Sequence, residues 1–88
     1  MTVRVVIPGQ LRSYTDGLAE VTAEGATLAQ LFADLDRQFP GIRFRVIDEQ
    51  DRVRRHIVVF VGETRQDDLD AALPEGRAVQ IIGALSGG

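Results

Sequence analysis

Few side chains in this 88-residue sequence could carry out chemistry, and the missing residue types restrict it further. Cysteine is absent, so the chain can form no disulfide, no thiolate zinc site and no thiol nucleophile. All ten basic residues are arginine, which leaves no lysine amine for a Schiff base. The single imidazole, His56, begins an apolar run, where a packed or solvated histidine is commoner than a catalytic one. Ser13 and Ser86 have no evident histidine and aspartate companions, so we expect no hydrolase triad and no catalytic residue. One histidine and no thiol leave too few ligands for an ordinary zinc site, so we expect no bound metal.

Charged residues gather in two places. Asp67, Asp68 and Asp70 indicate a solvated turn at a helix start, where acids favour the helix dipole, and a metal site is the less favoured alternative. The densest basic stretch is interspersed with acidic residues, which favours a solvated loop over a docking patch; its arginines are Arg43, Arg45, Arg52, Arg54 and Arg55. With a formal net charge of -3, we expect no nucleic-acid partner.

The end of the sequence, Leu85-Ser86-Gly87-Gly88, offers a different kind of chemistry. We expect Gly88, the last residue of the sequence, to carry a free α-carboxylate, and a segment with few side chains can enter a channel that is too narrow for other residues. This tail follows the last apolar run and can extend by roughly 15–20 Å. A glycine pair alone is a weak signal, because chain ends are often small and flexible.

The first strands and the main helix position this tail. The Val-rich run 2–7 predicts a strand buried on both faces, and 18–23 predicts a second strand that pairs with it as an antiparallel hairpin with a long loop. Thr27 and Gln30 form a capping box at the start of a helix that Pro40-Gly41 ends. Its apolar stripe predicts packing on a sheet and consists of Leu28, Leu31, Phe32, Leu35 and Phe39.

The second half predicts three further strands. Residues 42–55 read as a connecting loop with at most a short helical turn, and 67–73 as a brief helical turn. The strands are 57–61, a short edge strand at 64–65, and 78–82. The apolar first and last strands are expected to be parallel neighbours. This order predicts an α+β, β-grasp (ubiquitin-like) fold, with a mixed four- to five-stranded sheet and one main helix on one face.

We expect one domain over 1–83 and a flexible tail over 84–88. No stretch of the sequence approaches 18 apolar residues, and the beginning of the chain lacks the features of a signal peptide. The expected compartment is therefore the cytoplasm, with no membrane partner.

With this order of elements, the chain resembles the ubiquitin-like sulfur-carrier family, the ThiS/MoaD group, over essentially its whole length. The matching segments include Pro8-Gly9-Gln10-Leu11-Arg12, Gly25-Ala26-Thr27-Leu28, Phe39-Pro40-Gly41-Ile42 and the final Gly87-Gly88. The glycine pair is the specific element. The first hairpin and the extended connection before Ile57 look most similar to CysO-type and MoaD-like carriers. The chain departs from many relatives at Gly83, where they place proline before the tail.

The resemblance implies a carrier protein with no bound cofactor, not an enzyme. An ATP-dependent, ubiquitin-activating-type partner would adenylate Gly88, and sulfur would then displace AMP to leave a thiocarboxylate. Gly87, Ser86 and Leu85 would thread into the partner. The sulfur acceptor would be a synthase: preferably cysteine synthase-like, otherwise the large subunit of molybdopterin synthase, or an enzyme of thiamine or thio-sugar assembly such as a thiosugar synthase. From other classes, the chain could be a protein modifier joined to lysines through Gly88, or a simple interaction module.

Overall fold

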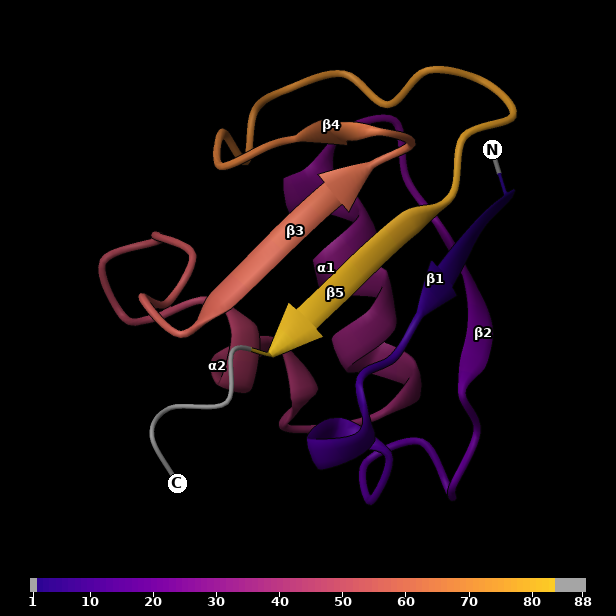
Figure 1. Cartoon of the computed structure of the whole chain (residues 1–88), viewed down its shortest axis with the longest axis vertical. Coiled ribbons are helices and arrows are strands. Elements are labelled where there is room, and N and C mark those ends of the chain that lie inside the picture. Colours follow the sequence, from indigo (N-terminus) through magenta and orange to yellow (C-terminus); the bar gives the residue numbers. More distant parts are fainter. Residues whose placement is uncertain (1, 84–88) are drawn as a thin grey trace.

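The computed structural model describes residues 2–83 and shows one sheet with helices on one side (Figure 1). The predicted order of elements is confirmed. In chain order the elements are β1 (Thr2–Val6), a short 3₁₀ helix (Gly9–Leu11), β2 (Glu20–Glu24), α1 (Leu28–Gln38), α2 (Ile42–Val46), β3 (Ile57–Val61), β4 (Thr64–Arg65) and β5 (Val79–Gly83). No helix within this part of the chain is long and apolar enough to cross a membrane.

The five strands lie in the order β2-β1-β5-β3-β4. The first and last strands, β1 and β5, are parallel neighbours, as their apolar runs predicted. The hairpin of β1 with β2 is antiparallel, and so are the pairs of β3 with β4 and with β5. The mixed sheet with one main helix is the predicted α+β, β-grasp arrangement.

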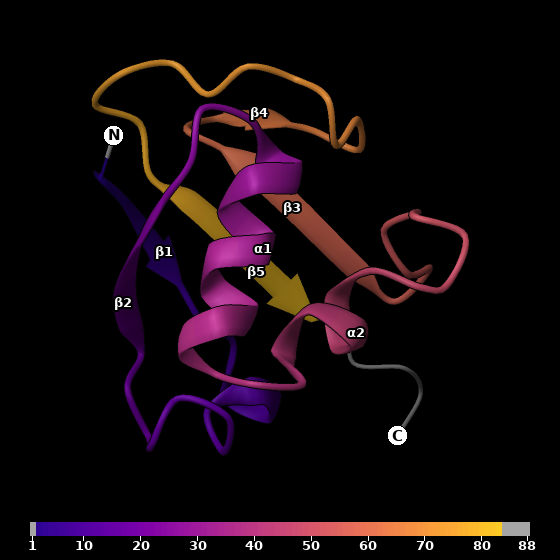
Figure 2. The ribbon, with the colours of Figure 1, turned by 180° about the vertical axis from the view of Figure 1, so that it is seen from behind.

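Helix α1 begins where the sequence predicted. Thr27 is its N-cap, and the Thr27 hydroxyl accepts a hydrogen bond from the Gln30 backbone N–H at 3.2 Å. The Gln30 side chain reaches back to the Ala26 backbone N–H at 2.9 Å. The helix lies across one face of the sheet (Figure 2). Its buried side chains are Leu28, Leu31, Phe32 and Leu35, and the predicted stripe is confirmed, with Phe39 packed at its margin.

Two strand predictions need correction. Strand β1 is not buried on both faces, because Thr2 and Arg4 are exposed while Val3 and Val5 are buried. The two α-helices cover only one side of the sheet, so alternate residues face outward (Figures 1 and 2). The second strand begins two residues later than predicted, and Leu18 is 51% exposed.

Two connections also differ from expectation. Residues 42–55 contain helix α2, and three of the apolar side chains in this polar stretch, Ile42, Val46 and Ile47, are fully buried. The interpretation as a connecting loop therefore missed a part of the core. The helical turn predicted over 67–73 is wrong, because the structure has no helix there and only a short, non-helical turn. The Ala71 backbone N–H closes this turn by donating a hydrogen bond to the Asp68 carbonyl at 3.1 Å.

Candidate functional site

The tail singled out by the sequence lies outside the described residues: this holds for Leu85, Ser86, Gly87 and Gly88. Its assignment stays a prediction, as does the division into 1–83 and 84–88. The structure does locate the residue from which the tail leaves, Gly83 at the end of β5. We call Gly83 the tail root.

Two segments flank the tail root. Gly83 is opposite Ile57, the first residue of β3, in the antiparallel pair of β3 and β5. On its other side lies Gln10 of the 3₁₀ helix, whose side-chain amide occupies the space that a Cβ on residue 83 would need. Glycine at this position therefore lets Gln10 lie against the strand end. The sequence marked Gly83 as unusual but gave no sign of its neighbour, because 73 positions separate the two residues.

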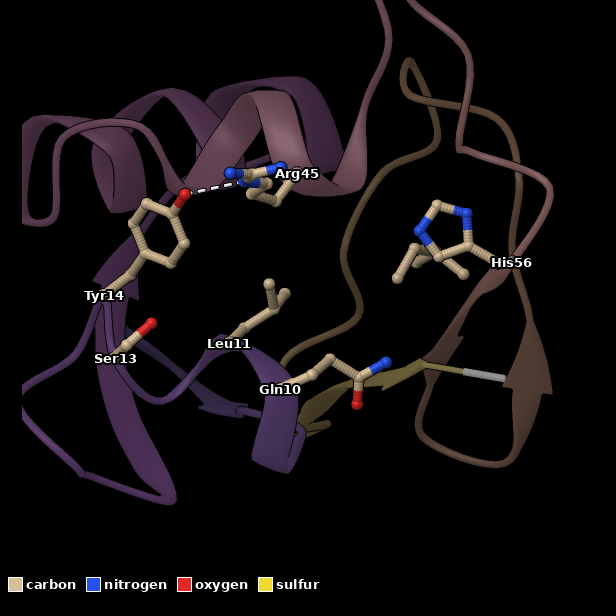
Figure 3. A pocket seen from close by; sticks show the side chains of 7 residues that line it. Gln10, Leu11, Ser13, Tyr14, Arg45 and His56 are labelled. Carbon is tan, nitrogen blue, oxygen red and sulfur yellow. Dashed lines mark hydrogen bonds between the residues drawn. The ribbon is translucent and has the colours of Figure 1, made fainter. Parts of the chain in front are cut away.

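A pocket of about 340 Å³ opens beside the tail root (Figure 3). The Tyr14 hydroxyl, on one side, accepts a hydrogen bond from Arg45 Nε at 2.6 Å, and His56 lies on the other side. Ser13 and the exposed His56 both line this pocket, yet no carboxylate from residues 2–83 does. The lining thus lacks the acid that a Ser-His-Asp triad requires. The lining residues are Gln10, Leu11, Ser13, Tyr14, Arg45, His56 and Ile57.

On the face of the sheet that the helices do not cover, apolar side chains lie next to the tail root. Ile82, the residue before Gly83, is 38% exposed and pairs with the half-buried Val58 of β3. Phe60 and Gln80 form the next pair on this face. Since Val59 and Ile81 between them are buried under the helices, these side chains point away from the helices, on the other face of the sheet.

The acidic cluster forms local contacts. Asp67 pairs with Arg65 at 3.6 Å, and the Asp68 carboxylate accepts a hydrogen bond from the Asp70 backbone N–H at 2.9 Å. Within residues 2–83, no three histidine or acidic side chains are arranged so that they could hold a metal ion.

Comparison with known proteins identifies relatives of the whole chain. A model of the ThiS family matches residues 5–88. The sulfur carrier protein CysO of Mycobacterium tuberculosis (strain H37Rv) is 33% identical over an alignment of 93 positions, which covers 100% of both chains. The sulfur carrier protein CysO of Mycobacterium bovis matches equally well.

Solved structures are similar in fold as well. A chain of the BexX/CysO complex of Amycolatopsis orientalis matches with a TM-score of 0.86 and 33% identity, covering 98% of this chain and 99% of that one. For CysO of M. tuberculosis the TM-score is 0.85 at 31% identity, with 94% and 99% covered. SAMP1 of Haloferax volcanii has a TM-score of 0.82 over 100% of both chains but only 20% identity, so this likeness shows the fold alone.

Proposed function

The chain belongs to the ThiS family, and on that premise we propose that it is a sulfur carrier whose Gly88 carboxylate is converted to a thiocarboxylate. The observation that carries the proposal is the 33% identity to the CysO sulfur carriers, which extends over the full length of both chains. The protein acts as a carrier for partner enzymes and is not itself an enzyme.

The proposed chemistry needs a partner because a carboxylate is a poor acyl donor. An ATP-dependent activating enzyme would join the Gly88 carboxylate to AMP and release pyrophosphate. Hydrosulfide would then attack the acyl carbon, so that a C–S bond forms, the C–O bond to AMP breaks, and AMP leaves with the electron pair. The product loses its proton and remains an anionic sulfur nucleophile at neutral pH. Because the chain has no cysteine or lysine, it supplies no thiol or side-chain amine to capture the activated acyl group.

The described residues would present the tail. Gly83 is fixed in the sheet by its pairing with Ile57, so the tail leaves from a rigid point. Five residues follow it, which extended would span roughly 17 Å, enough to enter a partner's active site. We further propose that Ile82 and Val58, beside the tail root, contact the partner's surface. The complex of an Amycolatopsis CysO with BexX supports a protein partner for this chain.

The likeness to the CysO carriers favours cysteine synthesis as the destination, with a cysteine synthase-like enzyme as the acceptor. Transfer to molybdopterin synthase, thiamine or thio-sugar assembly would use the same tail and differ in the partner. The small archaeal modifier SAMP1 resembles this chain in fold alone, so this likeness does not support the alternative that the chain is a protein modifier.

Intact mass spectrometry tests the proposal. The chain is incubated with ATP, sulfide and candidate activating enzymes of the adenylating type. A carrier gains about 16 Da at its C-terminus, as oxygen is replaced by sulfur. A modifier would instead appear attached to lysines of target proteins, and an interaction module would show neither change.

A further inference from the structure

A second hollow lies beside the tail root, and four arginines and two aspartates, Asp51 and Asp67, line it. It has a volume of about 460 Å³, and Ile57, the residue opposite Gly83, lines both this hollow and the pocket of Figure 3. The arginines are Arg52, Arg54, Arg55 and Arg65. The other pocket contributes Arg45. Both hollows that meet at Ile57, opposite the tail root, are therefore lined by arginine side chains.

Most of these arginines form no close ion pair within residues 2–83. Among the described residues, Arg65 pairs with Asp67, and Arg43 pairs with Asp51 at 3.2 Å. The remaining four form no ion pair with a carboxylate within residues 2–83. We call them the arginine rim: Arg45, Arg52, Arg54 and Arg55. The charge of the rim contrasts with the formal net charge of -3 for the whole chain.

Two rim arginines are held in place by aromatic residues. The Arg54 guanidinium lies over the Phe44 ring at 4.5 Å from its centroid, and Arg54 Nε donates to the Phe44 carbonyl at 2.7 Å. Arg45 lies over Tyr14 at 5.7 Å and donates to its hydroxyl. A guanidinium that is already ordered loses less conformational entropy when it binds a carboxylate.

The loop that carries three of the rim arginines, Arg52, Arg54 and Arg55, is also fixed. The Asp48 carboxylate accepts hydrogen bonds from the backbone N–H groups of Arg52 and Gln50, and these bonds lower its pKa. The backbone of Ile47 and Val53 closes the loop through a β-bridge. Figure 1 shows α2 and this loop at the end of the sheet where β5 ends.

We propose that the arginine rim binds an acidic surface at the mouth of the partner site that receives the tail. The inference rests on the proposed function. Guanidinium groups pair with carboxylates in bidentate fashion, and charges at the edge of an interface speed encounter and fix its orientation. Phe44, which is 53% exposed and lies against Arg54, adds an apolar contact that suits a protein surface better than a nucleic acid.

A titration followed by NMR tests the rim without any enzyme. The probe is an octamer of glutamate, and an octamer of uridylate serves for comparison. We expect glutamate to shift the Nε–H resonances of the rim arginines, and Arg55→Glu to weaken binding at least about fivefold. The matched control is Arg77→Glu, because Arg77 is also exposed, has no ion pair within residues 2–83, and lies before the opposite end of β5. It should bind as the wild type does.

Kinetics with an activating enzyme provide the second arm. Arg55→Glu should raise the KM for the carrier about tenfold at low salt with kcat unchanged, and Arg77→Glu should change neither. The difference in KM between Arg55→Glu and the wild type should become smaller as the salt concentration approaches 1 M, where the Debye length is about 3 Å. If the wild type gains no sulfur, the carrier function fails, while the titration still decides on the rim. No shift with glutamate, tighter binding of uridylate, or equal losses in both variants would overturn the rim proposal.

Discussion

The side chain of Gln10 lies where a Cβ on residue 83 would stand. The two residues come from opposite ends of the chain, and their contact sets the surroundings of the tail root. Residue 83 is also the last one that the structure describes before the proposed reactive tail.

We predict that Gly83→Ala displaces the Gln10 side chain with little loss of stability. The clash involves only the flexible end of Gln10, so the free energy of unfolding should change by less than about 1 kcal/mol. Two-dimensional NMR should show a large shift of the Gln10 side-chain amide. In a Gln10→Ala background, Gly83→Ala should cost less still. An unchanged Gln10 resonance would contradict the contact.

Gly25 should behave differently. A Cβ at this position would lie 2.5 Å from the Leu31 backbone nitrogen and 2.9 Å from the Leu31 Cα, which cannot move without shifting α1. Gly25→Ala should therefore lower the free energy of unfolding by about 1–3 kcal/mol in urea denaturation. Gly9→Ala is the control, because a Cβ there meets no atom within 4 Å, and it should be close to neutral.

Leu31 tests the packing of the helix on the sheet. It is fully buried in one cluster with Val5, Val59 and Val79. We expect Leu31→Ala to cost about 2–5 kcal/mol of unfolding free energy, measured by urea denaturation. A loss below about 0.5 kcal/mol would place Leu31 at the surface and refute the helix register.

We predict that the hydrogen bond between Asp34 of α1 and the backbone of β2 weakens in acid. Its carboxylate accepts hydrogen bonds from the Glu24 backbone N–H at 2.8 Å and from Arg37, and these bonds lower its pKa from the ordinary value of 3.8. Since the folded-state pKa is depressed, the stabilisation is present above pH 3.8 and is lost as the pH falls through the lower folded value. Asp34→Asn should destabilise the protein at pH 6 and match the wild type well below pH 3. An equal loss at both pH values would show that ionisation of Asp34 is not the cause.

The predictable part of the fold is the part whose signals are local. Thr27 and the stripe that includes Leu31 define α1, because a capping side chain and a helical period lie within a few residues of each other. The apolar runs of β1 and β5 predicted their parallel pairing. The apolar run of β1 also led to the wrong prediction that this strand is buried on both faces, because the sequence does not show that the helices cover only one side of the sheet.

The remaining features depend on contacts between distant residues. Ile42 and Val46 are buried, but they are interspersed with arginines that suggested a solvated loop. The arginine rim was likewise unexpected, because the acids near it in the sequence suggested neutralisation. In the structure, the Asp48 carboxylate accepts backbone hydrogen bonds and forms no close ion pair with the nearby Arg52 and Arg54, although their charges also help to lower its pKa. The reactive tail was found by its residue types alone, and its role stays a prediction.

The central claim is that Gly88 is the reacting residue and that Gly87 provides clearance beside it. Deleting Gly88 moves the carboxylate by about 3.3–3.6 Å, the reach of one extended residue. A misplacement of even 1 Å can cost about 100-fold in rate. Gly87→Val keeps the length of the tail but adds a β-branched side chain, which would obstruct a narrow channel. The core described for residues 2–83 is built from other positions, and we expect both variants to unfold at the wild-type urea concentration.

The most direct measurement is the rate of thiocarboxylate formation, followed by intact mass with the activating enzyme, ATP and sulfide. The wild type should gain sulfur, whereas the Gly88 deletion and Gly87→Val should form thiocarboxylate at least about 100-fold more slowly. Sulfur gain by the Gly88 deletion at the wild-type rate would contradict the assignment of Gly88 and with it the carrier function proposed for this tail.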